Sequence, residues 1–209
     1  LKICYEATYL GFSLYRDLKN KDYDCEVIAP SSIPRPSDSF VKTDRIDARK
    51  LAQYYKKEML TVVGVPDAEV EIVRSVCRSR MFLTKQIKQL KRHILATCRQ
   101  YGIHYRGSEL TQSKGKVVAY FTTTHTNWLN IEINKSDSEL LKFNLKMLLN
   151  QMEQVQHQID FVDEEIKKIS EQEKYLKKVQ SLVCYRGIST LTAMVFITEI
   201  GDVKRFKHP

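Results

Sequence analysis

The chain has 209 residues, 43% of them hydrophobic and 28% charged, which is the composition of an ordinary globular protein of one or two domains. Its net charge of +9 favours an acidic partner, nucleic acid ahead of an anionic membrane. No apolar run approaches the ~20 residues of a membrane span and no signal peptide is apparent, so we expect a cytoplasmic protein without a membrane partner.

The first residues and the cysteines limit the class further. The opening LKICYEA is apolar and lacks an initiator Met, which predicts that these residues belong to a longer protein. The five cysteines are scattered and form no CxxC pair. This pattern predicts reduced thiols rather than a zinc site or a disulfide framework.

Residues 1–66 alternate between strand and helix patterns. The predicted elements are, in order, a strand ending near Glu6, a helix over 11–21, a strand over 25–30, a helix over 44–59 and a strand over 60–65. A serine- and proline-rich loop separates the second strand from the second helix. This order predicts an α/β domain with parallel strands.

Residues 67–182 have a helical pattern. A long helix is predicted over 70–101, whereas the polar, Thr-rich segment 107–137 shows no sustained period and is interpreted as a connection with little regular structure. An apolar stripe at alternating spacings of four and three residues then predicts a coiled-coil seam. The stripe consists of Leu141, Leu145, Leu148, Met152, Val155, Ile159, Val162, Ile166 and Ile169. Its simplest partner is the helix at 70–101 packed antiparallel; the alternative is another subunit.

Residues 183–209 form a third predicted region. Gly187 follows an apolar stretch, and Gly201 ends a Thr- and Ala-rich helical pattern. This arrangement is typical of the start of a helix-hairpin-helix unit. Ser189 occupies the place where such hairpins often carry a second glycine, which weakens any prediction of a backbone phosphate cradle here.

A run of basic residues without any Asp or Glu spans 74–106. Its members are Arg74, Arg78, Arg80, Lys85, Lys88, Lys91, Arg92, Arg99 and Arg106. Because a solvated helix face normally mixes both signs, a single-sign face favours contact with nucleic-acid phosphates, while an ordinary solvated face is the alternative. Tyr101, His104 and Tyr105 are candidates for stacking on bases.

Two aspartates begin the helix at 44–59. Asp44 and Asp47 suit the first turn, where Thr43 or Asp44 is a good N-cap, so helix capping is one interpretation. At 100° per residue, however, both align with the apolar stripe of this helix, which predicts half-buried carboxylates pointing toward the sheet. Carboxylates in such a place repel each other unless a cation such as Mg²⁺ holds them ionised.

Glu6 provides a third carboxylate, at the end of the first predicted strand. Functional sites in open parallel sheets gather at the carboxyl ends of the strands. Glu6, Asp44 and Asp47 beside Lys42 and Arg45 therefore suggest metal-assisted chemistry on a phosphodiester.

Several motifs together resemble a known family. They are Tyr5-Glu6-Ala7 with Gly11 and Leu14, Ala29-Pro30-Ser31 with Ile33-Pro34-Arg35, Lys42-Thr43-Asp44 with Asp47-Ala48-Arg49 and Leu51-Ala52, and Arg186-Gly187-Ile188 with Leu191-Thr192-Ala193, Glu199-Ile200-Gly201-Asp202 and Arg205-Phe206. In this order they resemble the DEDD transposases of the bacterial IS-one-ten insertion-sequence family, which is related to the Piv DNA invertases.

The resemblance implies a fold and an activity. It implies a partial RNase H-like domain, similar to the resolvase RuvC, over 1–66, a basic coiled-coil region over 67–182 and the start of a C-terminal transposase domain over 183–209. Glu6, Asp44 and Asp47 match the second, third and fourth family acids, which bind Mg²⁺ or Mn²⁺. The first acid and the family's nucleophilic serine have no match here, and Ser189 is not that serine.

The resemblance also implies the partners. These are DNA, a structured guide RNA and further copies of the chain joined through the coiled coil, in the bacterial cytoplasm. Lys42, Arg45 and the basic run would bind the nucleic acid. The alternative function is a catalytically inactive fragment that binds nucleic acid and oligomerises.

Overall fold

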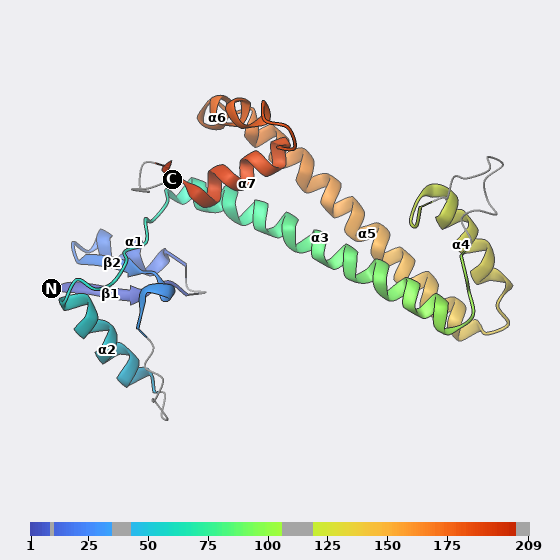
Figure 1. Cartoon of the computed structure of the whole chain (residues 1–209), viewed down its shortest axis with the longest axis horizontal. Helices are drawn as coiled ribbons and strands as arrows, with labels where there is room; N and C mark the ends of the chain where they lie inside the picture. The colour runs from blue at the N-terminus through green and yellow to red at the C-terminus, as the bar shows by residue number, and fades with distance from the viewer. Residues whose placement is uncertain (9–10, 35–42, 106–118, 204–209) are drawn as a thin grey trace. The chain divides into compact units, whose positions relative to one another are not determined.

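Figure 1 shows the computed structural model of the chain, which describes residues 1–8, 11–34, 43–105 and 119–203. The chain divides into two compact units, residues 1–67 and 68–209. The division follows Pro66, where alternating strands and helices give way to long helices. Each unit therefore has its own secondary-structure class.

The first unit contains a small parallel sheet. Strands β1 (Lys2–Glu6) and β2 (Asp24–Ile28) pair in parallel with Cys4 opposite Glu26. Helix α1 (Ser13–Asn20) lies between them in sequence, because parallel strands need a crossover connection. The predicted parallel pairing of these two strands is confirmed, and Val27 and Ile28 of β2 are fully buried.

A 3₁₀ turn, η1 (Pro30–Ser32), follows β2, and helix α2 (Asp44–Lys56) comes after the loop. The Tyr55 hydroxyl of α2 donates a 2.8 Å hydrogen bond to the Glu26 carboxylate on β2. Burial, followed by this hydrogen bond, raises the pKa of Tyr55 to about 12. The bond fixes the C-terminal half of α2 against the sheet.

The predicted third parallel strand over 60–65 is wrong. The chain makes only an isolated antiparallel bridge between Val62 and Ile28, with the Val63 N–H donating to the Val27 carbonyl at 2.7 Å. The reason is the direction of approach. Thr61 reaches the C-terminal end of β2, where its carbonyl accepts from the Ala29 N–H, so the chain runs back against β2.

Two long helices form the body of the second unit. Helices α3 (Ala68–Gln100) and α5 (Glu139–Ser170) run antiparallel, as Figure 1 shows. Ile94 and Cys98 near the end of α3 share a buried cluster with Leu145 and Leu148 near the start of α5. The apolar stripe predicted on α5 thus faces α3 and supplies most of the buried side chains of α5.

Helix α4 (Thr123–Lys135) corrects the prediction that 107–137 lacks regular structure. The Thr122 hydroxyl caps the helix by accepting from the His125 N–H, and the buried side chains are His125, Leu129 and Ile133. Thr and Ile have only modest helix propensity, so packing against α3 and α5 is what stabilises the helical conformation of this segment. Residues 106–118 lie outside the described part of the chain.

Helices α6 (Glu173–Val183) and α7 (Thr190–Ile200) complete the second unit. Gly187 between them and Gly201 after α7 both have positive φ, which explains glycine at these two turns. Tyr175 of α6 and Met194 of α7 share one buried cluster with Cys77 of α3 and Ile166 of α5. The segment from 183 to 203 therefore packs into the same compact unit as the long helices.

Truncation of a core leucine tests the α3–α5 packing. Leu145 is fully buried, so Leu145→Ala should lower the free energy of unfolding by about 3 kcal/mol through lost burial and a cavity. Urea denaturation followed by circular dichroism measures the change. Leu140→Ala, on the same helix but 82% exposed, is the control and should cost less than about 0.5 kcal/mol. Equal effects of the two substitutions would contradict this packing.

Candidate functional site

The two aspartates occupy the first turn of α2. Thr43 is the N-cap, and its hydroxyl accepts a hydrogen bond from the Ile46 N–H at 3.4 Å. Asp44 is exposed and Asp47 is half-buried. The expectation that both point half-buried toward the sheet is therefore wrong for Asp44. One turn further along, the exposed Ala48 and the half-buried Leu51 border a cavity beside β1.

Glu6 is the last residue of β1 and is half-buried. It is two and four residues from Cys4 and Lys2, so these three side chains lie on one face of the sheet. Cys4 is paired with Glu26, which holds Tyr55 of α2, so this is the face that α2 covers. Glu6 therefore shares the α2 side of the sheet.

The structure does not gather the three acids. Among the described residues, no group of three or more His, Cys, Asp or Glu side chains is placed to hold a metal ion. Carboxylates are the ligand type that Mg²⁺ prefers, so the donor chemistry suits this ion. The spatial grouping that a metal centre requires is absent from the part of the chain that the structure describes.

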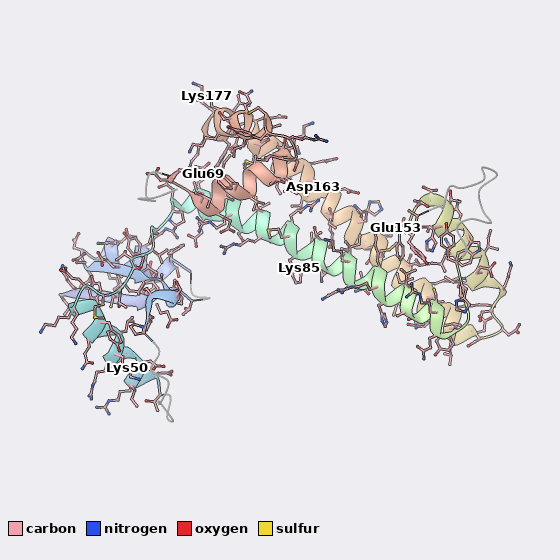
Figure 2. The ribbon with its side chains drawn as sticks, in the orientation of Figure 1. Lys50, Glu69, Lys85, Glu153, Asp163 and Lys177 are labelled. Carbon is pink, nitrogen blue, oxygen red and sulfur yellow. The ribbon has the colours of Figure 1, made fainter. Side chains whose placement is uncertain are left out.

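Four cations form a continuous basic stripe along α3. The stripe consists of Lys85, Lys88, Arg92 and Arg99, all exposed. At 100° and 1.5 Å per residue, they lie within an arc of roughly 60° and extend over about 21 Å. This arc is nearly opposite the buried Ile87 and Ile94, on the side of α3 turned away from α5, where Figure 2 labels Lys85.

The stripe is electrostatically unbalanced within the described residues. None of its four members has an ion-pair partner there. Single-sign exposed cations along one helix are the arrangement expected of a phosphate-binding surface.

Three other arginines of the basic run have protein partners. Arg78 makes two hydrogen bonds to the Glu199 carboxylate of α7, at 2.6 and 2.8 Å. Arg80 makes two to Asp163 of α5, at 2.8 and 2.9 Å. Arg74 donates to the Thr198 carbonyl at 2.7 Å. The idea that the whole run needs an external polyanion is therefore corrected for Arg78 and Arg80, because Glu199 and Asp163, distant in sequence, balance them.

The remaining predicted cations lie elsewhere. The Lys91 ammonium is 5.4 Å from the centroid of the Phe121 ring, a cation–π contact between α3 and the start of α4. Arg45 is exposed on the first turn of α2. Lys42 and Arg106 lie outside the described residues.

The aromatic residues after α3 have two different environments. Tyr101 and His104 are exposed. Tyr105 instead packs against Tyr120, His125 and Trp128, with ring centroids 4.4 to 5.2 Å apart. Sequence reasoning missed this cluster because it treated 107–137 as a connection. The spacing of four between His125, Leu129 and Ile133, after a capping Thr122, was the available signal.

His125 fixes the start of α4. Its Nδ1 atom accepts a 3.0 Å hydrogen bond from the Phe121 N–H, and the side chain is 1% exposed. Burial lowers the pKa of His125, because the charged imidazolium is poorly solvated there. The neutral form that the hydrogen bond requires is thus the favoured one.

Two further findings concern the class of protein. No helix in the described ranges is long and apolar enough to cross a membrane. All five cysteines are free.

Comparison with known proteins points to transposases of insertion sequences. The transposase for insertion sequence element IS1533 of Leptospira borgpetersenii is 32% identical over 212 residues, an alignment covering 98% of this chain and 58% of that protein. The y4qE protein of Sinorhizobium fredii, whose name designates it an inferred transposase, is 28% identical over 206 residues, covering 99% of this chain and 46% of that protein. The chain thus spans about half the length of these curated relatives.

The N-terminal half of the chain matches a protein-family model. Residues 2–103, which include the first unit and all of α3, match the model of the DEDD transposases of the IS110 (IS-one-ten) type. The chain belongs to this transposase family.

The buried His125 predicts a pH-dependent stability. In the unfolded chain its pKa returns to about 6.5, so the unfolded state binds the proton more readily. The stabilising contribution of neutral His125 should therefore be complete above pH ~6.5, and the free energy of unfolding should fall as the pH drops below that value. Urea denaturation between pH ~8 and ~5.5 measures this fall.

His125→Asn keeps an acceptor close to the Nδ1 position but does not titrate, so it should flatten the pH dependence. His157→Gln, exposed on α5, is the control and should leave it unchanged. The same slope in wild type and His125→Asn would show that another group is responsible.

Proposed function

We propose that this chain acts as part of an insertion-sequence transposase, which cleaves and exchanges DNA strands with a divalent metal and a structured guide RNA. The observation that carries the proposal is the basic stripe on α3, within the segment that matches the transposase family. Its four exposed cations without ion-pair partners among the described residues supply a surface for phosphates.

In this proposal Glu6, Asp44 and Asp47 are the chain's metal ligands, in an RNase H-like arrangement of the first unit. A bound Mg²⁺ or Mn²⁺ would polarise the phosphodiester and activate the attacking hydroxyl. The support is the donor type of the three side chains and the family membership. Two of the acids also lie close together in sequence, in the first turn of α2.

Assembly into a dimer or a higher oligomer through the α3–α5 coiled coil is a further part of the proposal. The apolar stripe on α5 is already used against α3, so contacts between copies would use the outer residues. Ile72 and Phe161, 65% and 66% exposed, are candidates on the two helices.

A second candidate function is nucleic-acid binding without catalysis. It is favoured by the absence of a three-acid group among the described residues. Removal of divalent metal separates the two candidates, because binding through the basic stripe does not depend on it.

Neutralisation of the basic stripe should reduce the salt dependence of DNA binding. Replacing Lys85, Lys88, Arg92 and Arg99 together by Gln removes up to four phosphate contacts. The slope of log Kobs against log[salt] should then become shallower by roughly 3 to 4, about 0.9 for each contact. Fluorescence anisotropy with duplex DNA over a salt series measures it.

Lys168→Gln is the control, because Lys168 is an exposed lysine on α5 paired with Glu165. Its slope should remain that of the wild type. An unchanged slope in the fourfold variant would exclude the stripe as the phosphate-binding surface.

Neutralisation of the acids tests the catalytic part. Asp47→Asn or Glu6→Gln should reduce strand joining in a plasmid assay by at least about a hundredfold, since a metal supplies several kcal/mol of transition-state stabilisation. DNA binding and the circular dichroism spectrum should stay unchanged. Asp67→Asn, an exposed acid of the same unit, is the control. Retained strand-joining activity in both test variants would contradict the catalytic role of these acids and favour nucleic-acid binding without catalysis.

A further inference from the structure

A groove of about 700 Å³ lies between α4 and α5, where Figure 2 labels Glu153 of α5. We propose that this groove, here called the amide groove, binds unpaired nucleobases of a looped or single-stranded nucleic acid. The inference rests on the proposed function, because it assigns a second surface to the same nucleic-acid partner. The volume falls within the range of small-ligand sites.

Free side-chain amides give the groove its chemistry. Asn127 and Asn130 line it from α4 and Asn150 lines it from α5. All three are exposed and none has a hydrogen-bond partner among the described residues. A carboxamide presents a donor and an acceptor side by side, which matches the edge of a base. Within a paired duplex the Watson–Crick edges are occupied, so unpaired bases are the better fit.

Phe121 contributes an aromatic side chain to the lining of the amide groove. Its backbone has φ of 60°, in the left-handed region that a bulky residue rarely adopts. The Nδ1 atom of His125 and the cap at Thr122 hold this conformation. Strained residues held this firmly gather at functional sites, and an aromatic ring is the usual platform for a splayed base.

The charges favour bases in the groove and phosphates at its rim. Lys146 and Glu153 both line the groove and offset each other, so it lacks the single sign of the basic stripe. Lys91 contacts the Phe121 ring from α3 and lies within one turn of Lys88 and Arg92 of the stripe. Lys91 therefore provides one cation of α3 beside the aromatic residue of the amide groove, where it can contact a phosphate next to a bound base.

The test uses the whole chain and hairpin oligonucleotides. One hairpin has a loop of ordinary nucleotides, and its matched partner has the same stem and phosphates but an abasic loop. Both are made as RNA and as DNA, because the two share the base chemistry. Binding is measured by fluorescence anisotropy at fixed salt.

The wild-type chain should bind the ordinary loop about tenfold more tightly than the abasic loop. The double variant Asn127→Ala/Asn150→Ala should lose this preference and keep its affinity for the abasic hairpin. Asn134→Ala is the matched control, because Asn134 is an exposed amide on α4 that does not line the groove, and it should behave as wild type. Thermal unfolding confirms that each variant is folded.

Equal wild-type affinity for both hairpins would overturn the amide groove while leaving phosphate binding and the proposed function in place. Equal weakening of both hairpins in the folded double variant would also overturn it, because the loss would then concern phosphates. No binding of either hairpin by the wild type would instead contradict the proposed function. If the double variant loses the preference for the ordinary loop only with the RNA hairpins, or only with the DNA hairpins, the result supports the groove. It then also identifies which of the two nucleic acids the groove binds.

Discussion

The burial of one apolar face of α5 against α3 is the interaction on which the second unit depends. It aligns the two helices antiparallel, so the end of α3 meets the start of α5. A hydrophobic cluster then forms at each end of the helix pair. Helix α4 packs at one of these ends, and α6 and α7 pack at the other. These shorter helices are stabilised mainly by the hydrophobic clusters that they share with α3 and α5.

The same packing divides the cations of α3 into two groups. Toward its N-terminal end, Arg78 and Arg80 meet Glu199 and Asp163, which α7 and α5 bring to them from more than 80 residues away. Beyond this point the four residues of the basic stripe face outward, nearly opposite the buried side chains. The basic run of α3, which begins after Glu69 and Glu71, thus has two arginines paired within the protein and one surface left for a polyanion.

Two carboxylates of the first unit lie in the helix-capping turn, and the proposed metal-ligand role is compatible with that position. Thr43 caps α2, and Asp44 and Asp47 occupy the turn where backbone N–H groups lack helical partners. Acidic side chains in this turn interact favourably with the helix dipole, and carboxylates are also the ligand type that Mg²⁺ prefers. Capping and ligand roles are therefore compatible, and the family match gives the ligand role its support.

Local chemistry was readable directly from the amino acids. The parallel strands ending at Glu6 and Ile28, the Thr43 cap and the apolar stripe of α5 each depend on short-range periodicity or capping, which neighbouring residues dictate. Other features required contacts distant in sequence. The antiparallel return at Val62, helix α4, the partners of Arg78 and Arg80 and the amide groove arise only when separate segments meet, because each is determined by which surfaces become buried together.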